Sequence, residues 1–169
     1  LVEIQTPKDM PFMTLDPTLR GKRLTDAQSK ARDILITQMN SATFNTTLLR
    51  GVTGSGKTEV YLEAVANCLA AGQQALVLLP EIALTSEFIL RVEDRFGAKP
   101  AEWHSGVTMT ERRRTWKMAA QGGLQLVVGA RYSLFLPFRS LGLIVVDEEH
   151  DSSYKQEDGV LYNARDMAV

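Results

Sequence analysis

The sequence has few of the features that mark secreted, membrane-spanning or disordered proteins. Its 169 residues include one cysteine, so neither an internal disulfide nor a zinc site built from several cysteines can form. No run approaches the roughly 20 consecutive apolar residues of a transmembrane helix, and residues 1–10 lack the basic and apolar regions of a signal peptide. Neither sign of charge is in excess, because 19 Lys and Arg balance 20 Asp and Glu. These absences predict a globular cytoplasmic protein without a membrane partner.

Length and proline placement predict one main domain. A domain usually has about 100 to 200 residues, so this chain has room for a single domain with its own core. Residues 1–23 contain Pro7, Pro11 and Pro17 and show no sustained periodicity, which indicates a linker or the tail of a preceding domain. The folded domain is expected over residues 24–169. Because the chain lacks an initiator Met and stops after an apolar-rich run, we expect an excerpt of a longer protein.

Apolar runs alternate with helical stretches along the expected domain. We predict strands at 46–50, 74–79, 101–104, 124–128 and 143–146, and helices at 57–71, 83–96 and 110–121. The strand runs are apolar at consecutive positions, which indicates burial on both faces. Thr25, followed three residues later by Gln28, is expected to cap a further helix. The pattern therefore predicts a three-layer α/β domain with a mainly parallel sheet.

A phosphate-binding motif lies between the first predicted strand and the helix after it. The run GVTGSGKT at residues 51–58 matches G-x-x-x-x-G-K-[ST]. Its glycines let backbone N–H groups converge on phosphate oxygens, and the helix dipole adds positive potential there. We expect Lys57 to reach the β- and γ-phosphates and Thr58 to place its hydroxyl on Mg²⁺. The other candidates for holding the nucleotide are Gly51, Thr53, Gly54, Ser55, Gly56 and Glu59.

An acidic run, DEEH, follows the last predicted strand directly. In open α/β sheets ligands bind at the carboxyl ends of the strands, where this run is expected to lie. Asp147 is expected to hold Mg²⁺, and Glu148 to orient or deprotonate the water that attacks the γ-phosphate. His150 is expected either to link the nucleotide site to a moving element or to bond a neighbouring loop as a structural histidine.

The two motifs together resemble the DExH branch of superfamily 2 helicases, and longer runs are similar to its replication-restart members. These runs are GVTGSGKTEVYL (51–62), LLPEIALT (78–85), WHSG (103–106), VVGARYSLFLPF (127–138) and VDEEHDSSYKQEDGVLYNARDMAV (146–169). The resemblance implies a RecA-like P-loop NTPase lobe of a bacterial 3′-to-5′ DNA helicase that uses ATP and Mg²⁺ at stalled forks. It further implies forked and single-stranded DNA, primosome proteins and single-stranded DNA-binding protein as partners, and association with the nucleoid.

The resemblance also assigns roles to individual residues. It makes Gln28 a reader of the adenine edge, since an amide both donates and accepts. It assigns Thr85 and Arg131 to holding DNA phosphates. It makes the segment after DEEH a loop in which stacking on unpaired bases is coupled to ATP hydrolysis. The residues expected to contact DNA in that loop are Tyr154, Lys155 and Gln156.

Further parts are implied outside these residues. A helicase of this class needs a second lobe, because that lobe supplies an arginine finger to the transferring phosphoryl group. The resemblance also implies a zinc-binding insertion and an amino-terminal DNA-binding domain in the longer protein, with no zinc in this part. By itself this chain is therefore expected to be an incomplete first lobe that binds nucleotide weakly and hydrolyses it slowly or not at all.

The residues leave three other functions open. One is a superfamily 2 translocase that moves on duplex DNA without separating the strands. Another is a phosphotransferase built on the same phosphate-binding loop. The third is a docking platform for primosome or single-strand-binding partners that keeps the fold without its chemistry. The presence of Lys57, Thr58, Asp147 and Glu148 argues against a decayed site.

Overall fold

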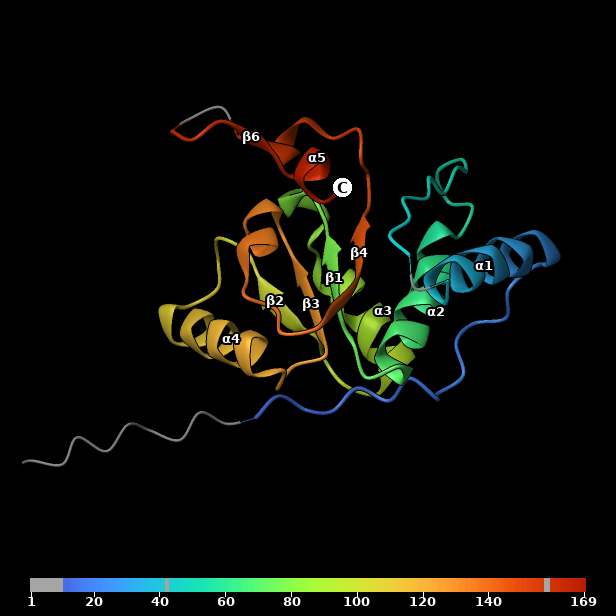
Figure 1. The fold of residues 1–169 in the computed structure, drawn as a ribbon, viewed down its shortest axis with the longest axis horizontal. Helices are drawn as coiled ribbons and strands as arrows, with labels where there is room; N and C mark the ends of the chain where they lie inside the picture. Colours follow the sequence, from blue (N-terminus) through green and yellow to red (C-terminus); the bar gives the residue numbers. More distant parts are fainter. Residues whose placement is uncertain (1–10, 42, 157–158) are drawn as a thin grey trace, which may run out of the picture.

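A parallel sheet forms the centre of the computed structural model, which describes residues 11–41, 43–156 and 159–169. Within these residues the sheet has four strands in the order β2-β3-β1-β4. They are β1 (Gln74–Leu78), β2 (Ala101–Trp103), β3 (Leu126–Gly129) and β4 (Leu141–Val146). A separate antiparallel ribbon pairs β5 (Lys155–Gln156) with β6 (Tyr162–Asn163). The predicted parallel α/β sheet is confirmed (Figure 1).

Helices cover both faces of this sheet. They are α1 (Asp26–Met39), α2 (Lys57–Ala70), α3 (Ser86–Phe96), α4 (Met109–Gln121) and α5 (Ala164–Met167), with 3-10 turns η1 (Glu81–Ala83), η2 (Arg131–Phe135) and η3 (Ser152–Tyr154). One core packs α2 and α3 on one face, and a second core packs α4 and α5 on the other. Helix α1 lies beside α2, away from the sheet, and has no buried residue (Figure 1). The predicted three layers are therefore present.

Strand β1 shows why the strand runs are apolar at every position. Successive side chains of a strand point to opposite faces. Ala75 and Val77 accordingly belong to the core under α2 and α3, while Leu76 and Leu78 belong to the core under α4. All four are fully buried. An unbroken apolar run is thus the signature of a strand covered on both sides.

The strand predicted at 46–50 is wrong, because residues 44–50 form no strand. Among the described strands, β4 pairs with β1 alone, so its outer edge is open. Residues 43–51 lie across a hollow from that edge, and the apolar side chains of Phe44 and Leu48 are 75% and 67% exposed. A short apolar run becomes a strand only where an adjacent edge supplies backbone partners, and here the hollow separates residues 46–50 from the open edge of β4.

One residue of the expected linker or domain tail over residues 1–23 is anchored in the core. Leu15 is 3% exposed in the core beneath α2 and α3. Its backbone N–H and carbonyl both bond the side-chain amide of Gln125, at 2.7 and 3.1 Å. This anchor ties the chain to the domain at Leu15, while the other residues of 11–23 are exposed or half-buried, and the expected domain boundary at residue 24 stays a prediction. Residues 1–10, with Pro7, lie outside the described residues.

The predicted helix starts hold to within three residues. The capping box of Thr25 and Gln28 is confirmed at the start of α1. Helix α4 begins one residue earlier than predicted, because Thr108 forms its own capping box with Glu111. Helix α3 begins three residues later, since the chain first makes the turn η1. No helix among the described residues has the length and apolar character needed to cross a membrane.

Candidate nucleotide-binding site

The phosphate-binding loop is shaped by its glycines. Gly54 and Gly56 have φ values of +76° and +79°, in the left-handed region that favours glycine. A Cβ on Gly56 would also collide with the amide nitrogen of Gln28. The loop therefore turns tightly and enters α2 at Lys57, so that the amino end of this helix faces the loop.

The ammonium of Lys57 is held by its own loop. Nζ donates to the carbonyl oxygen of Gly51 at 2.8 Å and lies 3.4 Å from that of Val52. An ammonium has three donors, and phosphate oxygens are stronger acceptors for it than neutral carbonyls. A phosphate oxygen could therefore replace these carbonyls as the acceptor of the Lys57 ammonium without any change in the core.

The acidic run begins where β4 ends. The N–H of Asp147 donates to the carbonyl of Leu78 at 3.0 Å, which ties the turn to β1. Its carboxylate accepts the Tyr61 hydroxyl at Oδ2, at 2.8 Å, and the Glu148 N–H at Oδ1, at 2.9 Å. Glu148 has a φ of +48°, the only positive value of a non-glycine residue in the described part of the chain. Such strain is found at functional sites that hold a side chain in place.

Tyr61 is a residue of this site that the sequence reasoning missed. It is 5% exposed on α2. Burial, and next the nearby charge of Asp147 and the hydrogen bond to it, raise the pKa of Tyr61 far above its usual value, while the Thr58 side chain acts the other way. The phenol thus stays protonated beside both residues predicted to hold Mg²⁺. Its spacing could have revealed it, because four residues after Lys57 is the same face of the helix.

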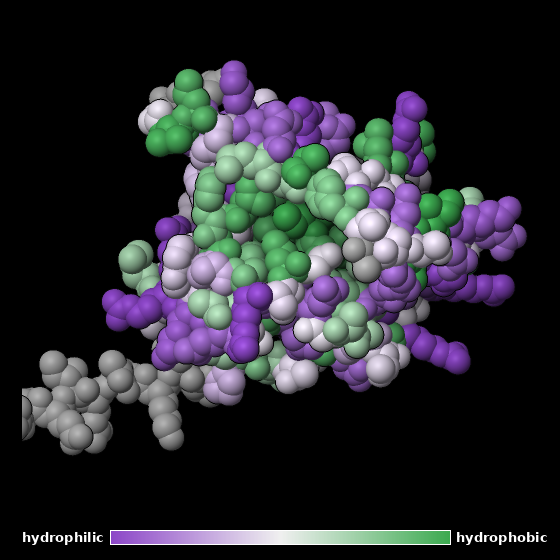
Figure 2. Space-filling model, in the orientation of Figure 1, coloured by the Kyte–Doolittle hydropathy of each residue, from purple (hydrophilic) through white to green (hydrophobic). Residues whose placement is uncertain are grey.

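Both motifs line one hollow of about 900 Å³, within the usual range of ligand pockets. From the loop side Gly51, Thr53 and Lys57 face it, and from the acidic run Asp147 to His150 do. Apolar side chains of β4 form its floor, and Figure 2 shows this apolar hollow at the centre of the face. The structure therefore brings together two motifs that are far apart in the sequence.

Two predicted nucleotide contacts are engaged elsewhere. The carboxylate of Glu59 pairs with Lys22 at 3.0 Å and lies 3.8 Å from Arg91. The amide of Gln28 accepts the N–H of Thr25 and donates to the carbonyl of Ser55 at 2.8 Å. Gln28 therefore bridges α1 and the phosphate-binding loop, and its adenine-reading role stays a prediction.

His150 lies at the open side of the hollow. Its side chain is 76% exposed, with Nε2 3.6 Å from Oε2 of Glu148. The imidazole of His150 and the carboxylate of Glu148 form an ion pair only when the imidazole is protonated. The structure thus places His150 beside the candidate catalytic carboxylate, and its coupling role stays a prediction.

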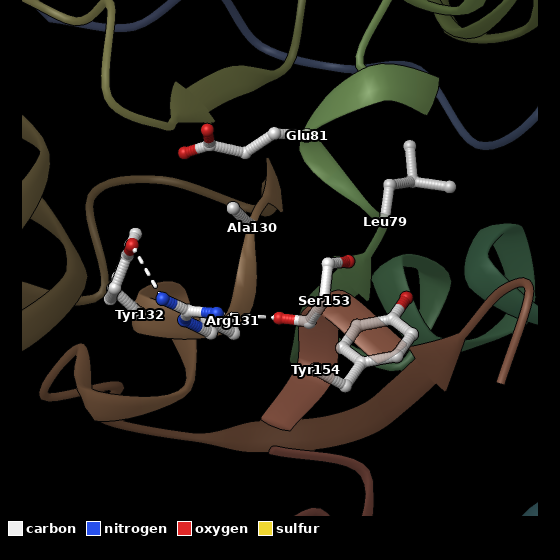
Figure 3. A pocket seen from close by; sticks show the side chains of 7 residues that line it. All are labelled: Leu79, Glu81, Ala130, Arg131, Tyr132, Ser153 and Tyr154. Atoms are coloured by element: carbon white, nitrogen blue, oxygen red, sulfur yellow. Dashed lines mark hydrogen bonds between the residues drawn. The ribbon is translucent and has the colours of Figure 1, made fainter. Parts of the chain in front are cut away.

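Arg131 holds the segment after the acidic run. Its Nη1 donates to the carbonyl of Ser153 at 2.7 Å and to that of Lys155 at 3.2 Å, and Nη2 donates to the hydroxyl of Tyr132 at 3.1 Å. Figure 3 shows the guanidinium between Tyr132 and Ser153 in a small pocket of about 110 Å³ that also includes Glu81. A DNA phosphate would have to compete with these carbonyls for the guanidinium.

Tyr154, which is predicted to stack on DNA bases, lies inside the core. The side chain is 1% exposed, and its hydroxyl donates to the carbonyls of Leu78 at 3.0 Å and Asp147 at 2.6 Å. A ring packed in the core has no free face for a base. The aromatic residue of this loop joins the end of β1 to the end of β4 instead.

Other predicted DNA contacts lie on the surface. Thr85 is exposed and caps α3, with its hydroxyl oxygen accepting the N–H of Phe88 at 3.2 Å. A helix start of this kind favours a phosphate. Lys155 is exposed and Gln156 half-buried, and both belong to β5.

A model of the DEAD/DEAH box helicase family matches residues 25–168. The chain belongs to this family, whose members use ATP and Mg²⁺. It is 55% identical over 123 residues to the replication restart protein PriA of Rickettsia conorii, covering 73% of this chain and 19% of that protein. The PriA protein of Bacillus subtilis is 44% identical over 146 residues, covering 86% of this chain and 18% of that protein. The PriA protein of Chlamydia muridarum is 40% identical over 169 residues, covering 99% of this chain and 22% of that protein.

The resemblance to replication-restart helicases is thus confirmed by these relatives. The chain spans about a fifth of the length of the curated relatives that it matches.

Proposed function

We propose that this chain is the ATP-binding lobe of an ATP-dependent 3′-to-5′ DNA helicase that acts at stalled forks in replication restart and primosome assembly. The observation that carries the proposal is the meeting of Lys57 with Asp147 and Glu148 in one hollow at the carboxyl edge of the sheet. The names of the relatives support the process, and the polarity rests on resemblance. A cytoplasmic, nucleoid-associated location follows from the same proposal.

The residues present fit a magnesium nucleotide. Mg²⁺ in such sites takes one or two protein oxygens together with phosphate oxygens and water, and Asp147 and Thr58 offer a carboxylate and a hydroxyl for this. When bound, the ion neutralises charge on the phosphate oxygens. In this proposal Lys57 exchanges the carbonyl of Gly51 for a phosphate oxygen, and Glu148 orients the attacking water.

The DNA strand is proposed to follow the surface formed by the start of α3, the turn η2 and β5. Thr85 offers a helix start, and Lys155 an exposed ammonium. Arg131 reaches this surface only by releasing the carbonyls of Ser153 and Lys155. That exchange would connect DNA binding to the segment that follows Asp147. Primosome proteins and single-stranded DNA-binding protein are proposed as partners of the longer protein, which by resemblance also binds zinc outside this chain.

The lobe alone is proposed to have little or no ATPase activity. An arginine finger from a second lobe is worth about 10³ to 10⁵ in rate. Restoring that lobe is therefore expected to raise turnover by orders of magnitude, and an unchanged rate would contradict the two-lobe proposal.

ATPase activity of the full-length protein tests the function. We expect strong stimulation by forked or single-stranded DNA, and a fall of about 10²- to 10³-fold in Lys57→Ala, because a preorganised charged donor to the phosphates is lost. Lys99→Ala, an exposed lysine before β2, is the control and should keep the activity. Hydrolysis indifferent to DNA would favour a phosphotransferase, and absent hydrolysis a docking platform.

A strand-displacement assay on a forked duplex then separates two kinds of motor. A helicase releases the displaced strand at a rate that depends on ATP. A duplex translocase hydrolyses ATP and removes a bound obstacle, such as a streptavidin block, without releasing a strand.

A further inference from the structure

The hydroxyl of Tyr61 bonds one of the two side chains proposed to hold magnesium. It donates to Oδ2 of Asp147 at 2.8 Å. The ring itself is 5% exposed and packs in the core between α2 and the sheet. The core therefore fixes the ring, and the ring presents one polar atom to the nucleotide site.

The second oxygen of the same carboxylate is also held. Oδ1 of Asp147 accepts the N–H of Glu148 at 2.9 Å. Glu148 has the left-handed φ of +48°, so its N–H direction and the carboxylate orientation depend on each other. A chain of two hydrogen bonds thus runs from α2 through Asp147 to the backbone of the candidate catalytic carboxylate.

We propose that Tyr61 is a positioning residue that orients the Asp147 carboxylate for Mg²⁺ and, through it, the backbone of Glu148. The proposal rests on the ATPase function proposed above. Tyr61 acts through Asp147 and contacts neither phosphate nor water in the reaction. Partners of this kind fix the direction of a metal-binding side chain, and their loss typically costs about 10- to 100-fold in metal affinity or activity.

The phenol is suited to this role because its hydroxyl donates directly to the carboxylate. Tyr61→Phe removes that single donor and keeps the ring that fills the core. The variant therefore separates positioning from packing.

The test uses the full-length protein and a fluorescent ADP analogue, titrated first in EDTA and then with increasing Mg²⁺. Tyr61→Phe is expected to bind the analogue in EDTA as the wild type does. The Mg²⁺ concentration that gives half of the metal-dependent gain in affinity should rise about 10- to 100-fold. At saturating Mg²⁺, kcat for ATP hydrolysis should fall while KM for ATP changes by less than about twofold, since Glu148 acts on the attacking water and not on nucleotide binding.

The matched control is Tyr154→Phe. It also removes a buried phenol hydroxyl, but one that donates to backbone carbonyls and not to the carboxylate. It should move the Mg²⁺ midpoint by less than about twofold, far below the shift expected for a metal-orienting partner.

Three results would overturn the inference. An unchanged Mg²⁺ midpoint in Tyr61→Phe, even with a lower Tm, would make Tyr61 a packing residue. An equal shift in Tyr154→Phe would show that the bond to the carboxylate has no special part, because the Tyr154 hydroxyl bonds only the backbone carbonyl of Asp147 among the described atoms of that residue. A wild-type protein that binds no nucleotide at all would overturn the proposed function itself, and the positioning role with it.

Discussion

The phosphate-binding loop and the segment after the acidic run present their polar side chains in opposite ways. Among the described residues, Lys57 bonds only carbonyls of its own loop, at the edge of an open hollow. Tyr154 is buried, and Arg131 donates to carbonyls that belong to the neighbouring segment. The first region can take a ligand by exchanging local bonds, whereas the second can respond only if its packing changes. Residue types alone therefore do not separate a ready binding site from a structural connection.

The largest expected effect is on ATP hydrolysis at the candidate nucleotide-binding site. Glu148→Gln should lower single-turnover ATP hydrolysis by about 10²- to 10⁴-fold, because the general base is lost, while nucleotide affinity stays near that of the wild type. Glu149→Gln is the matched control, since its carboxylate pairs with Arg165 at 3.2 Å. It should keep most of the activity. A greater loss in Glu149→Gln would reverse the assignment of the two carboxylates.

Substitutions of Tyr154 and Lys57 are expected to differ strongly in their effect on the free energy of unfolding. Removing a large buried ring costs about 3 to 5 kcal/mol, so Tyr154→Ala should lower the free energy of unfolding by that amount in urea. Tyr154→Phe should cost about 1 kcal/mol for its lost hydrogen bond, and Lys57→Ala should stay within about 0.5 kcal/mol of the wild type. Normal stability of Tyr154→Ala with lost DNA stimulation would restore base stacking as its role.

The difference between local patterns and long-range contacts explains which features could be predicted from the sequence. The phosphate-binding loop, the acidic run and β1 are local patterns whose meaning needs no distant partner, and the structure has them where expected. The burial of Tyr154 and the anchoring of Leu15 depend on contacts with residues far along the chain. Residues 46–50 failed as a strand for the same reason, because strand formation needs a neighbouring edge.

Substitutions of Arg131 test whether this residue contacts DNA or only holds the segment after the acidic run. If it reaches a DNA phosphate, Arg131→Ala should reduce the slope of log affinity against log salt by about 1. Arg131→Lys should keep that slope, since an ammonium can hold a phosphate, but lose DNA stimulation of the ATPase, because one nitrogen cannot replace the fork in which Nη1 holds the loop carbonyls and Nη2 the hydroxyl of Tyr132. Arg113→Ala, an exposed arginine on α4, is the control. An unchanged slope in Arg131→Ala would confine Arg131 to holding the loop.

Gln28 is expected to show the smallest effect. Gln28→Ala loses both the capping box and the bond to Ser55, and should cost about 1 kcal/mol in thermal unfolding together with nucleotide affinity. Gln28→Glu keeps a capping acceptor for Thr25, but it sets a carboxylate against the carbonyl of Ser55 in place of a donor. It should therefore keep the stability and lose the nucleotide affinity. Comparison of the affinities for ATP and GTP then distinguishes the two roles of Gln28. Equal losses of affinity for both nucleotides mean that Gln28 holds the loop. A loss confined to ATP means that its amide reads adenine.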